Sequence, residues 1–351
     1  MDDSQTAARW VSAWSTSPID ASLSEAGVLD RLGVAVTDVS ARTAVQLTAG
    51  GTHVRLTLSN IFGVLPLHVA ACTIALGADD AHGIDPATLR TVTFGGKKHV
   101  RIPAGESCTS DPAALPVTAG QTLSVTVFYR GINAMRTIGL IGGCSHAEIG
   151  NCTRRPMLHM AVPMQHTADS GAYEVIPALT EVDVLAAAGT HACVIFGDST
   201  VANELPRLLA ARLRADGIQN VSVTQAAIKG DRLVADGVGH AAKLLGGAGV
   251  KRFGRDVLGC ETLWARRARS GGRGHGARET GRERSHPPAL HEQTGTAGPG
   301  HVRTDDGGLP RTGRHGARAG RAHLVLRAHA VERLHAQPLR PRGRHPVVAG
   351  I

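Results

Sequence analysis

The most constraining feature of the sequence is a change of composition close to residue 260. After it lysine is absent, the larger apolar residues and cysteine fall to roughly 15% of positions, and arginine rises to roughly a fifth. Such a segment holds too little apolar surface to fold on its own. We therefore expect residues 261–351 to be a disordered Arg/Gly/His-rich tail, and any folded domain to lie before them.

The same change locates the charge of the chain. The whole chain has 38 basic and 29 acidic residues, of which about 17 and about 7 lie in the tail. The first 260 residues are therefore close to neutral and give no electrostatic reason to expect a nucleic-acid partner. Nonspecific nucleic-acid binding through the arginines of the tail is an alternative. The tail holds only Trp264 as an aromatic residue, which argues against specific recognition.

The N-terminus and the cysteines bear on location. The opening MDDSQTAARWVSAW has two acids and no apolar segment typical of a signal peptide, which favours a cytoplasmic protein, or a secreted one if translation starts upstream. No apolar run is long enough for a membrane span. The six cysteines form no metal-binding pattern. Cys144 and Cys152 can bridge in an exported protein and are otherwise reduced thiols.

The first half of the chain has the patterns of short β-strands. In VRLTLSN, the side chains of Val54, Leu56 and Leu58 fall on one face and polar side chains on the other. TLSVTVFYRG at 122–131 alternates similarly. A Gly-Gly pair in TVTFGGKKHVRIPAG separates two strand-like runs and predicts a hairpin. Short strands divided by Gly, Pro and Asp turns predict an all-β sandwich domain over residues 1–175.

A strand–helix–strand pattern begins near residue 190. ACVIF at 192–196 is a continuous apolar run, typical of a strand buried on both faces of a parallel sheet. Apolar residues then recur at helical spacing up to Gly217, and NVSVTQAAI at 220–228 is the next expected strand. Because such units build parallel sheets, we expect residues 190–260 to form an α/β domain.

Ser199 and Gly230 follow the two expected strands, where ligands of parallel sheets bind. A serine at the start of a helix becomes a nucleophile when a base takes its proton. A glycine at the second strand end can bring a backbone N–H close to a developing oxyanion. From the residues alone, an N-cap role for Ser199 and a plain turn role for Gly230 are the alternatives.

Three blocks of this region match a known pattern in order: VIFGDST, AAIKGDRLVADG and GVKRFGRDVL. They resemble the SGNH hydrolases, also called GDSL-type esterases and lipases. The N-terminal region is similar to the accessory β-domain of one subgroup of that family, in RWVSAWSTSP at 9–18, VRLTLSNIFGVLPLHVAACTIAL at 54–76 and TVTFGGKKHVRIPAGESCTSDPAALPV at 91–117.

The resemblance implies a flavodoxin-like, three-layer α/β fold with helices on both faces of a parallel sheet, preceded by the all-β sandwich. It implies a serine esterase or acylhydrolase that works through an acyl-enzyme and needs no metal or cofactor. Ser199 would be the nucleophile, and the N–H groups of Ser199 and Gly230 would form part of the oxyanion hole, while Asp198 orients the turn. The substrate would be an acylated carbohydrate or a short acyl ester.

The later family blocks are absent. The asparagine usual after the second-block glycine is Asp231 here. No asparagine follows Asn220, so the side-chain donor of the oxyanion hole is missing, and no Asp-x-x-His sequence occurs in the tail. The catalytic His and Asp are therefore unassigned. His345 precedes a proline but lacks the acid, and His286 follows a glutamate at the right spacing but lies too early in the chain.

The loss of these blocks coincides with the change of composition. We hypothesise a shift of reading frame near Cys260, since out-of-frame reading of a GC-rich gene yields Arg, Gly, Ala, His and Pro. A genuine basic tail is the alternative. In both cases the catalytic domain is interrupted, and we expect impaired esterase activity. The alternative function is an inactive remnant whose β-domain binds carbohydrate or a protein partner.

Overall fold

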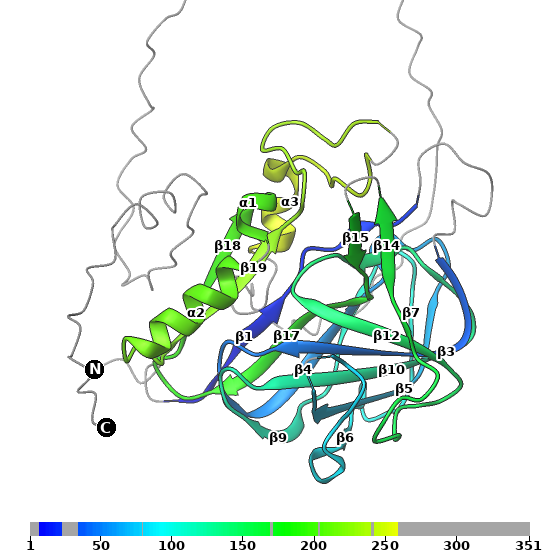
Figure 1. The fold of residues 1–351 in the computed structure, drawn as a ribbon, viewed down its shortest axis with the longest axis horizontal. Coiled ribbons are helices and arrows are strands. Elements are labelled where there is room, and N and C mark those ends of the chain that lie inside the picture. The colour runs from blue at the N-terminus through cyan, green and yellow to red at the C-terminus, as the bar shows by residue number, and fades with distance from the viewer. Residues whose placement is uncertain are drawn as a thin grey trace, which may run out of the picture. The chain divides into compact units, whose positions relative to one another are not determined.

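A computed structural model of the chain describes residues 7–22, 34–78, 80–168, 171–202, 204–239 and 242–258. Antiparallel strands make up most of this part, and the helices gather beside one parallel strand pair (Figure 1). The tail expected at 261–351 lies outside the described residues. No helix among the described residues has the length and apolar character needed to cross a membrane.

The larger antiparallel sheet has seven strands. Its central strand β10 (Thr122–Met135) pairs with β3 (Val34–Gln46) on one side and with β5 (Leu67–Leu76) on the other. The sheet continues beyond β3 and β5 through four short strands: β12 (Gly143–Ile149), β13 (Val162–Pro163), β6 (Arg90–Thr91) and β7 (Val100–Ile102). The apolar residues that β10 turns to one face are buried, as the alternation of the sequence predicts.

The second antiparallel sheet has five strands. In it β17 (Leu179–Ala186) lies between β1 (Arg9–Ser15) and β4 (Gly51–Ser59), and β8 (Ser107–Thr109) and β9 (Ala113–Val117) pair with β4. The predicted inward residues of β4 are confirmed, because Val54, Leu56 and Leu58 have no exposed surface. One apolar core joins the inner faces of both sheets, which makes this part sandwich-like.

Smaller elements complete the antiparallel part. They are the strands β2 (Ile19–Asp20), β11 (Thr137–Gly139), β16 (Ile176–Pro177), β14 (Gln165–Ala168) and β15 (Gly171–Glu174), and the 3-10 turn η3 (Pro86–Thr88). The predicted Gly-Gly turn forms at Gly95 and Gly96, both with positive φ. The predicted hairpin differs, because the runs on either side of this turn, β6 and β7, each pair with β5 rather than with one another. With β17 included, the antiparallel part continues to Ala186.

The strand–helix–strand unit forms where the sequence predicts it. Strand β18 (His191–Gly197) pairs in parallel with β19 (Val221–Ala227), in a register that sets Gly197 against Ala227. Between them lie α1 (Ser199–Ala202) and α2 (Leu205–Ala215), and α3 (Gly249–Asp256) follows β19. Residues of α1 and α2 pack on one face of the pair, and Phe253 of α3 and Val257, which follows α3, pack on the other.

The expected three-layer α/β fold is wrong for the described part of the chain. There the parallel sheet has two strands, β18 and β19, whereas the other sheets are antiparallel and hold most of the strands. The reason is visible in the sequence. Residues 192–228 encode one strand–helix–strand unit, and the remaining described residues up to 258 form loops and α3 without a further strand.

The parallel pair is joined to the sandwich through β1. The hydroxyl of Ser222 on β19 donates to the carbonyl of Ser12 at 2.5 Å, and the hydroxyl of Ser15 donates to the carbonyl of Gln225 at 2.8 Å. Ser222 also shares a 2.8 Å hydrogen bond with the hydroxyl of Thr48. The two strands β1 and β19 are therefore joined by hydrogen bonds from serine hydroxyls to backbone carbonyls.

Candidate active site

The two loops singled out in the sequence meet at the carboxyl end of the parallel pair. The backbone N–H of Ile228, just after β19, donates to the carbonyl of Gly197, the last residue of β18, at 3.2 Å. Ser199 lies two residues beyond Gly197, and Gly230 lies two residues beyond Ile228. The fold therefore brings both predicted site residues to the same edge of the sheet.

Ser199 is the first residue of α1 and its side chain is exposed. The preceding Asp198 accepts hydrogen bonds from the backbone N–H and the hydroxyl of Thr200, at 2.9 and 2.8 Å. Asp198 thus stabilises the turn, which matches its predicted orienting role. Within the described residues nothing hydrogen-bonds to the hydroxyl or the backbone N–H of Ser199.

Gly230 occupies a turn that favours glycine. Its φ is +75°, and the backbone N–H of Asp231 closes the turn on the carbonyl of Ile228 at 3.1 Å. A Cβ at this position would lie 2.5 Å from Cδ2 of Leu245. The N–H of Gly230 has no acceptor among the described residues, so a ligand can take it.

Arg252 of α3 holds this edge of the sheet together. Its side chain is 2% exposed and donates to the carbonyl of Gly197 at 3.1 Å and to the carbonyl of Ala226 at 2.8 Å. The guanidinium lies 4.3 Å from the centre of the Phe196 ring. It also reaches the sandwich through the hydroxyl of Ser17, at 3.2 Å.

Two carboxylates compensate the buried charge of Arg252. Asp231, in the turn of Gly230, lies 2.5 Å from Nη2, and Asp256 on the next turn of α3 lies 3.0 Å from Nη1. Burial raises the pKa of Asp231, and the ion pair with Arg252 opposes this rise without cancelling it. The aspartate at 231 therefore has a local role, because it supplies a charged partner for Arg252.

No role was predicted for Arg252 from the sequence, although it lies in the quoted block GVKRFGRDVL. An arginine beside a phenylalanine on a short helix looks like any exposed basic residue. Its structural role becomes clear only from its ion pairs with Asp231 and Asp256. These pairs form when the chain folds and cannot be recognised from the sequence.

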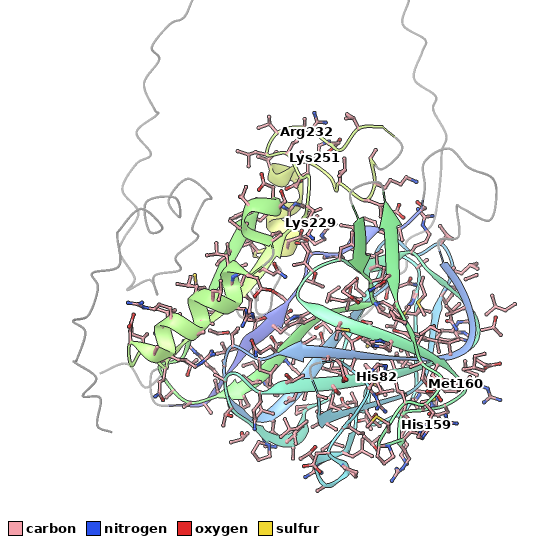
Figure 2. All side chains as sticks on the ribbon, in the orientation of Figure 1. His82, His159, Met160, Lys229, Arg232 and Lys251 are labelled. Atoms are coloured by element: carbon pink, nitrogen blue, oxygen red, sulfur yellow. The ribbon has the colours of Figure 1, made fainter. Side chains whose placement is uncertain are left out.

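The described histidines do not supply a base for Ser199. His191 starts β18, at the opposite end of the strand, and contacts Arg9 at 3.1 Å. A strand rises about 3.3 Å per residue, so His191 and Ser199 are separated by the whole length of β18. His191 therefore cannot act as the base of Ser199. Figure 2 shows His82 and His159 on the sandwich, well away from Lys229, the residue before Gly230. The weaker candidates His345 and His286 lie outside the described residues.

Cys144 and Cys152, the cysteines singled out in the sequence, lie in the antiparallel part of the described chain and not at this edge. Cys144 and Cys152 are both free thiols, so the structure contains no bridge between them. Burial raises the pKa of the Cys144 thiol to about 11, with the nearby Glu174 and Asp80 carboxylates adding to the rise. The described residues hold no group of His, Cys, Asp or Glu side chains arranged to bind a metal ion.

No protein-family model matches the chain, and no curated protein matches it. The chemistry of the site therefore depends on the resemblance of the sequence blocks and on the geometry at the carboxyl end of β18 and β19.

Proposed function

We propose that this chain derives from a serine ester hydrolase of the SGNH type, with Ser199 as the nucleophile. The observation that carries the proposal is the meeting of two loops. The exposed hydroxyl of Ser199 and the free N–H groups of Ser199 and Gly230 lie at one sheet edge, bound together by the hydrogen bond from Ile228 to Gly197.

The proposed reaction has two steps. The Ser199 oxygen bonds to the carbonyl carbon of an ester, its proton passes to a base, and the N–H groups of Ser199 and Gly230 stabilise the oxyanion. The carbon–oxygen bond to the alcohol then breaks, and the alcohol leaves with a proton. Water hydrolyses the resulting acyl-enzyme, which releases the acid and restores Ser199. Acylated carbohydrates and short acyl esters are the proposed substrates.

Turnover by this chain should be low. The third oxyanion donor of the family is missing from the sequence, and removal of one such donor costs about 10² to 10³ in turnover. The described residues also place no histidine beside Ser199, and a serine without its base retains little activity. The ion pair of Asp231 with Arg252 still holds the turn of Gly230 in place. The oxyanion donors are therefore better preserved in this chain than the catalytic base.

The test is labelling with a fluorophosphonate probe, which reacts with activated serines, followed by mapping of the modified residue by mass spectrometry. We expect slow labelling of the full chain at Ser199, because the N–H donors are kept while no described histidine serves as base, and none in Ser199→Ala. The matched control is Ser107→Ala, which removes another exposed serine, on β8. Its labelling should equal that of the unmodified chain. A folded sample that remains unlabelled at Ser199 would contradict the proposal and would leave the hydrolase as an inactive remnant.

A further inference from the structure

Two histidines from different elements of the sandwich stack on one another. His146 lies on β12 and is buried, whereas His82 lies in the segment between β5 and η3 (Figure 2). The centres of the two rings are 4.2 Å apart, and the ring planes are tilted by 41°. Two neutral rings attract one another at this distance. Two protonated rings repel one another, and an imidazole gains its proton within the physiological range of pH.

The segment 80–84, which carries His82, is held against the sheet by contacts of its backbone. The carbonyl of His82 accepts hydrogen bonds from Nη1 of Arg42 at 2.9 Å and from the backbone N–H of Leu158 at 3.0 Å. The preceding Ala81 has a φ of +60°, a conformation that alanine adopts only where its surroundings hold it there. The docked arrangement of this segment therefore depends on a small number of contacts, among which is the stacked pair of rings.

The position of His146 is unsuited to a positive charge. In the register of β12 and β3 it lies directly opposite Arg42, whose guanidinium is fully buried. Like charges directly opposite one another on neighbouring strands destabilise a sheet. Burial lowers the pKa of the His146 imidazole, and the adjacent His82 ring lowers it further.

Other titratable groups near His146 do not reverse this preference. They are Asp80, whose Oδ2 lies 3.4 Å from Nδ1 of His82, Glu174 on β15, and Glu148 and Cys144, each two residues from His146 on β12. The carboxylates of Asp80 and Glu174 favour a charged His146, but by less than burial and His82 oppose it. Glu148 is already paired with Arg155. The Cys144 thiol stays neutral, because burial raises its pKa to about 11.

The direction of the pH effect follows from these contacts. In the folded chain the pKa of His146 lies below the ordinary value of 6.5, so the docked arrangement favours the neutral ring. When segment 80–84 moves away, the ring becomes hydrated and binds a proton more tightly, so acid favours the open arrangement. The stabilising contribution of the neutral ring is complete above pH 6.5 and is lost as the pH falls through the folded pKa.

We propose that His82 and His146 form an acid-sensitive switch, which keeps segment 80–84 on the sheet at neutral pH and releases it when His146 takes a proton. Release also uncovers Cys144, whose Sγ lies 3.9 Å from the carbonyl oxygen of Asp80 in the docked arrangement. The switch belongs to the sandwich and does not depend on hydrolysis at Ser199.

The test is hydrogen exchange of the full chain at pH 7.5 and 5.0, measured by mass spectrometry and corrected for the intrinsic exchange rate at each pH. Two peptides report on the segment. One contains the N–H of Ile84, which donates to the carbonyl of Pro156 at 2.9 Å, and the other contains the N–H of Leu158. Their protection should fall about fivefold at pH 5.0, because the open arrangement binds the proton more tightly than the docked one.

His146→Phe keeps a stacked ring that cannot take a proton, and its protection should be the same at both pH values. If circular dichroism shows that this variant does not fold, His146→Gln decides the outcome with the same expectation. The matched control is His159→Gln, at an exposed histidine beside Leu158, and it should lose protection as the unmodified chain does.

Three results would overturn the proposal. One is equal protection of the unmodified chain at pH 7.5 and 5.0. Another is a folded variant without His146 that loses protection in acid as the unmodified chain does. The third is a pH dependence that disappears in His159→Gln, because it would assign the titration to that residue.

Discussion

At the scale of single residues, Arg252 concentrates more interactions than any other described side chain at the sheet edge. It joins the ends of β18 and β19 to α3 and to the sandwich, and two buried carboxylates face it. A buried ion pair adds little net stability compared with apolar packing, but removal of one partner leaves a charge uncompensated. Arg252 is therefore expected to be a positioning residue, which acts on Ser199 and Gly230 through the backbone.

Replacement of Arg252 by methionine should lower the free energy of unfolding by about 3 to 5 kcal/mol, because Asp231 would be left buried without a cation and Asp256 would lose one of its two arginine partners. Urea unfolding followed by circular dichroism measures this change. The control Arg212→Met removes an exposed arginine of α2 that pairs with Asp216, the residue after the helix, and it should cost no more than about 0.5 kcal/mol. Equal stability of the two variants would show that the Arg252 contacts are dispensable.

Glu181 on β17 is a second residue with an unusual environment. Burial raises its pKa well above the ordinary value of 4.5, and the neighbouring Asp183 carboxylate adds to the rise. The folded state therefore holds a proton here that the unfolded state releases near pH 4.5. Stability from this group is present at acidic pH and is lost as the pH rises from 4.5 through the folded pKa.

Glu181→Gln removes this dependence, since an amide stays neutral. We expect its melting temperature to exceed that of the unmodified chain by a few degrees at pH 8 and by less at pH 5. Differential scanning fluorimetry at both pH values provides the comparison. Glu106→Gln, at an exposed site, serves as the control and should show no such difference. A Glu181→Gln variant that is less stable at pH 8 than at pH 5, relative to the unmodified chain, would refute this assignment.

At the scale of elements, the sequence patterns correctly predicted strands whose formation depends on residues close together in the chain. The alternation in β4 and the continuous apolar run in β18 are both found as strands with the expected burial. Strand partners were less predictable, because β6 and β7 flank the Gly-Gly turn yet both pair with the earlier strand β5. A turn sequence specifies the turn, while the partner depends on contacts distant in the chain.

The candidate site divides in the same way. The positions of Ser199 and Gly230 at the strand ends could be predicted because each follows a strand with a recognisable turn, whereas their catalytic roles stay predictions. The role of Arg252 was missed, because its partners at 231 and 256 become visible only when α3 packs against β18 and β19. The extent of the parallel sheet was overestimated, since a family resemblance supplied strands that the described residues do not contain.

The turn that carries Gly230 provides a test at this scale. Gly230→Ala places a side chain at a φ of +75° and should cost about 1 kcal/mol. Gly217→Ala is a matched control, because Gly217 ends α2 with a φ of +84° and has no neighbour within 4 Å of an added Cβ. Urea unfolding should show a loss of stability in both variants, and a somewhat larger loss in Gly230→Ala, because there the added Cβ also displaces Cδ2 of Leu245. Fluorophosphonate labelling of Ser199 should fall only in Gly230→Ala, and equal labelling would argue against an oxyanion role for Gly230.

At the scale of the whole molecule, the antiparallel sandwich and the strand–helix–strand unit differ in the size of their apolar cores. The main core draws its buried residues from Val11 to Ala186, so the sandwich encloses a core of its own. The parallel pair has two strands and small clusters on its faces, and isolated two-stranded sheets are marginal in water. Its contacts to Ser12, Ser15 and Ser17 indicate that the sandwich supplies part of its stability.

This difference predicts how the parts behave when separated. A fragment of residues 190–258 should lack cooperative unfolding in urea, because Ser222 and Arg252 lose their partners on the β1 side and the edge of β19 becomes exposed to solvent. A fragment of residues 1–188 retains the whole main core and should unfold cooperatively, as should the full chain. Circular dichroism and urea titration of all three separate the cases. Cooperative unfolding of 190–258 alone would mean that the strand–helix–strand unit is an independent domain and that its contacts with β1 add little to its stability.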